Sequence, residues 1–155
     1  MRCSTTGGFE QVEDLNYTLR NVNMTTPSLT GNTFYFGRLS QGTIAPYNST
    51  FERCNTSNAG GIFYLYKGQV LNEELSKFRM NAAVYGGVLY CDHCVANFKT
   101  STLFYNAAKE ASIVYIWSIG QATPTVTYTN CTMTDGFAAN VGGGIVTRGT
   151  ALGYI

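Results

Sequence analysis

The chain is poor in charge and in long apolar runs, and each shortage excludes a class of protein. Only 12% of its 155 residues are charged and the formal net charge is +1, so its electrostatics favour neither nucleic acid nor an anionic membrane as a partner. No uninterrupted apolar run approaches the ~18 residues of a membrane-spanning helix. A hydrophobic content of 45% excludes disorder. We therefore expect one folded domain over residues 1–155, with no membrane span and no nucleic-acid partner.

Residues that carry chemistry are also scarce. The chain has one histidine, His93, and nine acidic residues, among which no Asp-Asp pair occurs. No nucleophile-elbow pattern accompanies the histidine. Glu73 and Glu74 fall within residues 72–80, which we interpret as a short helical turn or an outward loop with a solvated surface. We predict no catalytic residues, no metal site and no cofactor.

The most informative feature of the chain is a recurring glycine pair that is followed each time by a short apolar strand. Counted from the second residue of each copy (8, 32, 61, 87, 112 and 143), the steps are 24 to 31 residues. A repeat of roughly 20–50 residues is typical of a solenoid, in which each unit buries its face only by stacking on its neighbours. The chain therefore predicts about six coils. The copies begin at Gly7, Gly31, Gly60, Gly86, Ala111 and Gly142.

Aligning the copies on the glycines produces columns of residues. Strand side chains alternate between two faces, so we assign the second and fourth positions to the core and the first and third to the outer face. The core columns are Phe34, Phe63, Leu89, Val114 and Ile145, and Phe36, Leu65, Cys91, Ile116 and Thr147. The outer columns are Thr33, Ile62, Val88 and Ile113, and Tyr35, Tyr64, Tyr90 and Tyr115.

The tyrosine column, extended by Trp117, makes the outer face unusually apolar. Strands that are apolar on both faces are normally covered on both. Either an internal loop covers this face, or it is a packing surface for another copy or a contact surface for sugar, on which tyrosine rings offer flat apolar area.

A second motif places an apolar residue three positions before an asparagine. It occurs as Phe78-x-x-Asn81 and Leu103-x-x-Asn106, with Phe51-x-x-Cys54 as a near copy. Asparagine tolerates left-handed backbone conformations and bonds its own main chain. We therefore predict that these residues lie at corners between strands.

The Gly-Gly-aliphatic motif alternating with Phe-x-x-Asn resembles the repeats of right-handed parallel β-helices in the pectin-lyase-like superfamily. It is most similar to the GGA(I/L/V) and FxxN repeats of polymorphic outer-membrane-protein passenger domains, and to surface β-helix proteins of protists. The resemblance implies an all-β chain folded as a right-handed parallel β-helix of about six coils. Such motifs specify a fold and do not transfer an activity. The residues that carry it are Gly60-Gly61-Ile62, Gly86-Gly87-Val88, Gly142-Gly143-Gly144-Ile145, Phe78, Asn81, Leu103 and Asn106.

Sequons and cysteines indicate a secreted protein. Five cysteines would leave one thiol over after two disulfides. We interpret the Cys91-Asp92-His93-Cys94 tetrad as a structural disulfide or buried thiol in preference to a metal site or a redox centre. The predicted N-glycosylation sites are Asn16, Asn23, Asn48, Asn55 and Asn130, and the disulfide candidates are Cys3, Cys54, Cys91, Cys94 and Cys131.

These patterns favour a non-enzymatic structural role. An open β-helix exposes unpaired strand edges, and head-to-tail stacking of such ends produces a filament. We expect a secreted, N-glycosylated protomer of an extracellular fibre or surface sheath, with other copies of the chain and N-linked glycans as its partners. An adhesin-like glycan-binding module is the alternative, and a polysaccharide lyase or hydrolase ranks third.

Overall fold

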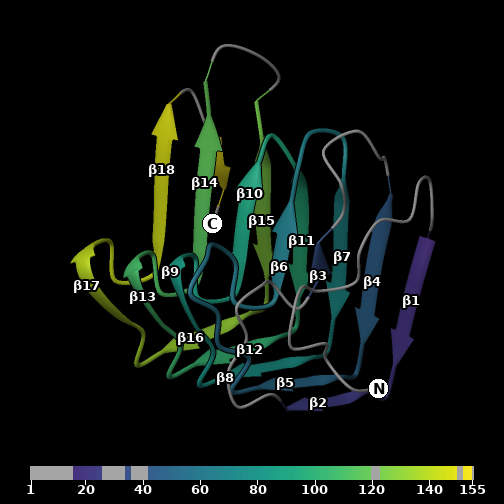
Figure 1. Cartoon of the computed structure of the whole chain (residues 1–155). Helices are drawn as coiled ribbons and strands as arrows, with labels where there is room; N and C mark the ends of the chain where they lie inside the picture. Colours follow the sequence, from purple (N-terminus) through teal and green to yellow (C-terminus); the bar gives the residue numbers. More distant parts are fainter. Residues whose placement is uncertain (1–15, 26–33, 36–41, 120–122, 150–151, 155) are drawn as a thin grey trace.

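The computed structural model describes residues 16–25, 34–35, 42–119, 123–149 and 152–154. Within these residues the chain forms 19 strands and no helix. All paired strands are parallel, and they stack as a β-helix in which the chain visits each sheet once per turn (Figure 1). The all-β, parallel β-helix fold predicted from the repeats is therefore confirmed.

Four parallel sheets form the walls, and Figure 1 shows three of them clearly: two run upright and one lies across the bottom. The long sheet contains β1 (Asn16–Arg20), β4 (Thr43–Tyr47), β7 (Val70–Glu74), β11 (Val95–Lys99), β15 (Thr125–Thr129) and β19 (Leu152–Tyr154). The base sheet contains β2 (Asn23–Thr25), β5 (Thr50–Glu52), β8 (Lys77–Arg79), β12 (Thr102–Phe104) and β16 (Thr132–Thr134). The tyrosine sheet contains β3 (Phe34–Tyr35), β6 (Phe63–Leu65), β10 (Leu89–Asp92), β14 (Val114–Ser118) and β18 (Ile145–Gly149), and the short sheet contains β9 (Ala82–Tyr85), β13 (Ala107–Glu110) and β17 (Phe137–Val141).

The stack has about four turns, so the prediction of six coils was wrong. Complete turns begin at β4, β7, β11 and β15, whereas β1–β3 form a partial turn before them and β19 starts one after them. The count of glycine pairs overestimated the number of turns because each weak copy of the pair was counted as a complete turn. The copy at Gly7 and the glycine of the copy at Gly31 lie outside the described residues.

The core columns are confirmed in register. Leu89 pairs with Phe63 on one side and with Val114 on the other, and all three side chains are buried. Ile145 continues the column, and Phe34 occupies its first position in the backbone pairing. The second column pairs in the same way through Leu65, Cys91, Ile116 and Thr147, whereas Phe36 lies outside the described residues.

One column was assigned to the wrong face. Ile62, Val88 and Ile113 are buried in the core and do not lie on the outer surface. The chain turns a corner at the glycines, where the N–H groups of Ile62 and Phe63 both donate to the Val88 carbonyl. The alternation of side chains between the two faces of the strand therefore begins only after the first position, which Ile62, Val88 and Ile113 occupy. Thr33, the first member of the column, lies outside the described residues.

Residues 72–80 do not form a helical turn or an outward loop. They belong to β7 and β8, separated by a corner at Leu75, whose φ is 62°. β7 is held in register between β4 and β11, and β8 between β5 and β12, so pairing on both sides overrides the local helical pattern. Glu73 consequently points inward and is buried, which corrects the expected solvated surface.

Two buried asparagines connect successive turns at the corner after the base sheet. The side-chain oxygen of Asn81 accepts a hydrogen bond from the Cys54 N–H at 2.9 Å, and that of Asn106 accepts one from the Asn81 N–H at 3.1 Å. Their amide groups donate to the carbonyls of Phe51 and Phe78 in the turn before. The predicted corner is confirmed.

The reason given for asparagine at this corner was wrong. The left-handed conformation belongs to the residue before each asparagine, with φ of 56° at Met80 and 53° at Tyr105. Asn81 and Asn106 are needed because a short amide can accept and donate at once, and so satisfies backbone groups that leave the sheet at the corner.

We expect Asn81→Ala to destabilise the fold by about 2–4 kcal/mol, because it strands the Cys54 N–H and the Phe51 carbonyl in the core. The matched control is Asn97→Ala, which removes two side-chain hydrogen bonds on the outer side of the long sheet, one donated to Asn72 and one accepted from the Thr127 hydroxyl. That control should change the free energy of unfolding by less than about 0.5 kcal/mol. Urea denaturation measures both, and equal losses would contradict this account.

Gly87 shows why a glycine is needed at the corner before the tyrosine sheet. A Cβ placed there would lie 2.7 Å from the carbonyl oxygen of Ala107 and closer still to that of Ser112. Both contacts are with backbone atoms of the next turn, so side-chain rearrangement cannot relieve them.

Gly87→Ala should therefore destabilise the protein by at least about 1–3 kcal/mol, as overpacked cores do. Gly143 in the last turn is the matched control, because a Cβ there meets no atom within 4 Å. Gly143→Ala should leave the midpoint of thermal unfolding unchanged. Thermal unfolding that shifts equally for both variants would show that close packing of turns is not the reason for the glycine pairs.

Candidate functional site

The tyrosine column lies on the outer face of the tyrosine sheet. Backbone pairing places Tyr64, Tyr90 and Tyr115 in register, and their rings stack with centroids 4.9 Å and 5.4 Å apart. Tyr35 occupies the preceding position in β3, and nothing is described of its side chain. The sequence thus predicted which tyrosines lie side by side.

Stacking changes what this column offers to a ligand. The planes are inclined by only 18° between Tyr64 and Tyr90 and by 7° between Tyr90 and Tyr115, so each ring covers the face of the next. Burial raises the pKa of Tyr90 and of Tyr115 above the ordinary value of 10. Tyr115 is buried and only Tyr64 and Tyr90 are partly exposed, so the column offers ring edges, in contrast to the flat surface expected from the sequence.

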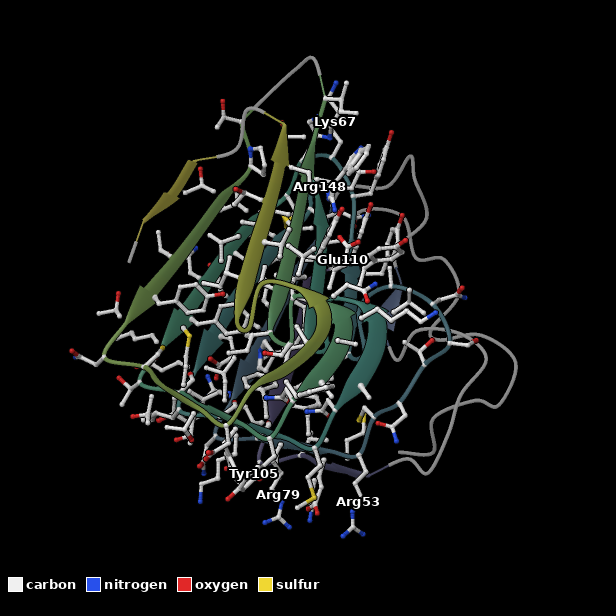
Figure 2. All side chains as sticks on the ribbon, turned by 90° about the vertical axis from the view of Figure 1, so that its left-hand side faces the viewer. Arg53, Lys67, Arg79, Tyr105, Glu110 and Arg148 are labelled. Atoms are coloured by element: carbon white, nitrogen blue, oxygen red, sulfur yellow. A yellow bond between two sulfur atoms is a disulfide. The ribbon has the colours of Figure 1, made fainter. Side chains whose placement is uncertain are left out.

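A groove lies beside this column and has a volume of about 440 Å³. In the lining of the groove, the Arg148 guanidinium donates a hydrogen bond to the Glu110 carboxylate at 2.8 Å. Figure 2 shows these two residues on one flank of the molecule. Tyr85 is tilted by 59° against Tyr115, with 5.2 Å between the ring centroids. The lining residues are Tyr85, Tyr90, Glu110, Tyr115, Trp117 and Arg148.

Three of these residues were missed from the sequence. Tyr85 and Glu110 pair with each other in the short sheet, each directly before a glycine pair or its degenerate copy. Arg148 pairs with Trp117 in the tyrosine sheet. Extending the alignment by one position before the glycines and one after the core columns would have identified all three.

The Cys91-Asp92-His93-Cys94 tetrad forms the corner between β10 and β11. Cys91 and Cys94 are joined by a disulfide with 5.3 Å between their Cα atoms, which confirms that these two candidate cysteines pair. His93 at the tip has a φ of 59°, and its Nδ1 lies 2.6 Å from the Asp92 carboxylate.

The remaining cysteines do not form a second disulfide among the described residues. Cys54 is buried at the asparagine corner, whereas Cys131 is a partly buried free thiol whose sulfur contacts the carbonyl of Phe98. Cys3 lies outside the described residues.

A buried carboxyl group lies inside the corner between the long and base sheets. Glu73 accepts hydrogen bonds from the Ser76 N–H at 2.8 Å and from the Ser101 hydroxyl. Ser76 in turn accepts a hydrogen bond from the Ser49 N–H, so the corner is connected from turn to turn. Burial raises the pKa of Glu73 above its ordinary value, and the hydrogen bonds offset this only in part.

The raised pKa of Glu73 makes stability depend on pH. The folded state holds the Glu73 proton more tightly than the unfolded chain does. The protonated side chain therefore stabilises the fold at low pH, and this stabilisation is lost as the pH rises from about 4.5 through the folded-state pKa. Glu73→Gln should remove this loss, so its free energy of unfolding relative to the wild type should increase with pH. Urea denaturation at several pH values between about 4 and 8 measures the difference.

Glu74→Gln is the control for this experiment, because Glu74 lies on the same strand and forms a solvent-accessible ion pair with Lys99. It should keep the wild-type slope. If the free energy of unfolding of Glu73→Gln depends on pH as that of the wild type does, Glu73 is not the source of the pH dependence.

Sequon asparagines lie in different environments. Asn48 and Asn130 are exposed at the same corner, each with positive φ, and Asn23 is exposed in β2. Asn55 is only partly exposed, and nothing is described of the Asn16 side chain. Glycosylation of all five remains a prediction.

The C-terminal end of the stack faces the viewer in Figure 2. Met133 is only partly buried, although its partner Leu103 in the turn before is fully buried. Ile145 is likewise only partly buried, whereas its partner Val114 is fully buried. Phe137 at the start of β17 is 64% exposed. The last turn therefore presents core positions that a further turn would cover.

The described residues contain no helix of the length and apolarity that a bilayer span requires. They also bring together no group of three or more His, Cys, Asp or Glu side chains suited to a metal ion. Comparison of the chain with protein-family models, with curated proteins and with solved structures finds no match. The assignment of a parallel β-helix thus depends on the architecture itself.

Proposed function

We propose that the chain is a non-enzymatic structural protein, a β-helix protomer that self-associates through the edge of its C-terminal turn. The observation that carries this proposal is the exposure of Phe137 and the incomplete burial of Met133 and Ile145 in that turn. Strands β16, β17 and β18 are the last members of their sheets, so their backbone groups face outward along the axis. An unpaired edge beside exposed apolar side chains favours pairing with another chain.

The two ends of the stack differ, which favours the C-terminal one as the point of contact. Leu19 and Met24 in the first turn are buried, whereas Met133, in the same column as Met24, is not fully buried. Pairing of this edge with the first turn of another copy would extend the parallel sheets into a filament, the arrangement expected from the sequence. Pairing of two C-terminal edges would instead close a dimer.

Several features support an extracellular setting for the assembly. The Cys91–Cys94 disulfide is typical of oxidising compartments, and Asn23, Asn48 and Asn130 are exposed sequons. The resemblance of the repeats to pectin-lyase-like β-helices of cell-surface proteins supports the same setting. A secreted, N-glycosylated fibre or sheath protomer therefore remains our proposal.

The acidic residues support a non-enzymatic role. Four of them are bound to cationic partners or to histidine: Glu52 to Arg79, Glu74 to Lys99, Glu110 to Arg148 and Asp92 to His93. A glycosidase needs two carboxyl groups that act on one bond, with one of them available as a general acid. The structural roles of these carboxylates favour the protomer over the lyase or hydrolase.

Self-association should depend on Phe137. Phe137→Asp introduces a charge into the proposed contact and should weaken association by about thirtyfold or more, the effect of losing an interface hot spot. It should leave folding intact because the side chain is exposed. Analytical ultracentrifugation over a concentration series measures the change.

The matched control is Leu75→Asp, which alters a side chain that is 40% exposed on the flank of the stack. Its positive φ suits aspartate, so folding and association should be unchanged. A concentration-dependent dimer would indicate paired C-terminal edges, and a ladder of larger species would indicate a filament. A wild-type chain that stays monomeric at every concentration would overturn the proposal.

A further inference from the structure

We propose that the groove beside the tyrosine column binds a neutral oligosaccharide, with one pyranose ring against Tyr85 and Trp117 and its hydroxyls on Glu110 and Arg148. This lateral site differs from the axial contact proposed above: only Arg148 comes from β18 in the C-terminal turn, and its other lining residues belong to earlier turns. Its volume of about 440 Å³ lies within the range of small-ligand sites, ~300–1,000 Å³.

The apolar walls come from rings outside the stack. Tyr85 is 39% exposed, and its ring is tilted against that of Tyr115. The ring face of Tyr85 is therefore not covered by a stacked neighbour, whereas the rings within the tyrosine column cover one another. Trp117 is partly buried and packs on the cluster that contains Ala111, Tyr115 and Val146, which fixes one side of its indole. Flat rings of this kind suit the C–H face of a sugar, which is apolar while its edge is polar.

The polar groups of the groove match a sugar's hydroxyls. A hydroxyl both donates and accepts, and its burial without a partner is costly. Glu110 supplies acceptors and Arg148 supplies donors within one ion pair. Tyr90 adds a hydroxyl group, which can both donate and accept. Donors and acceptors thus lie side by side at the edge of an apolar wall.

Charge favours a neutral ligand. Glu110 and Arg148 form a pair of zero net charge, and among the residues that the structure describes no other charged side chain lines the groove. A uronate would approach the Glu110 carboxylate, and a phosphate would find a single arginine that is already paired. A neutral sugar avoids both costs.

Trp117 is the only tryptophan of the chain, so its fluorescence reports directly on the groove. We would titrate the full chain with neutral oligosaccharides (β-glucan, mannan, xylan and chitin fragments) and with oligogalacturonate. At least one neutral oligosaccharide should produce a saturable change in fluorescence. Tyr85→Ala should weaken its binding by about tenfold, and Glu110→Gln should weaken it as well.

The control is Tyr105→Ala, which removes an exposed tyrosine far from the groove, at the bottom of the view in Figure 2. It should bind like the wild type. Phe137→Asp should also bind like the wild type, which separates this site from self-association. Circular dichroism of each variant verifies that the fold is retained.

Three results would overturn the inference. The first is the absence of a saturable change with every neutral oligosaccharide. The second is equal weakening by Tyr85→Ala and Tyr105→Ala. The third is binding of oligogalacturonate alone, lost in Arg148→Gln and improved in Glu110→Gln, which would assign the groove to an anionic sugar.

Discussion

The fold depends on hydrogen bonds that buried corner side chains make from one turn to the next. Sheet pairing holds the straight segments, but the backbone leaves the sheets at each corner, where its polar groups would otherwise be buried without partners. Asn81 and Asn106 supply those partners at one corner, and Ser49, Ser76 and Glu73 supply them at another. The bonds of Asn81 and Asn106, the Ser49–Ser76 bond and the bond from the Ser101 hydroxyl to Glu73 join different turns, so the corners fix the register along with the sheets.

Register in turn determines what the surfaces can do. Because side chains repeat in columns, tyrosines stack on tyrosines, and the charged and aromatic residues of neighbouring columns meet in one groove. In the turn that begins at β15, core positions such as Met133 are only partly buried. A lateral site and an axial contact are therefore two consequences of one architecture, and neither requires catalytic chemistry.

Much of this architecture was predictable from the sequence. The glycine pairs predicted the stacking of Phe63, Leu89 and Val114, because a backbone that permits close approach of turns has few alternatives to glycine. Residues 72–80 and Glu73 were misassigned because strand pairing from both sides outweighs local helical pattern.

The alignment could have identified the residues that line the groove, but it could not show that they meet in one place. The groove joins residues from the short sheet and the tyrosine sheet, and Glu110 and Arg148 meet only because the chain makes one more turn between them. Its charged pair therefore has no signature within a single repeat. The faces of the tyrosine rings, likewise, could be judged only once their mutual stacking was known.

The most direct test of the account is scalar coupling across the corner hydrogen bonds, measured by nuclear magnetic resonance on the isotope-labelled chain. We predict couplings from the Cys54 amide nitrogen to the side-chain carbonyl carbon of Asn81, and from the Asn81 amide nitrogen to that of Asn106. Couplings seen between the strands of the base sheet but absent at these two corners would contradict it.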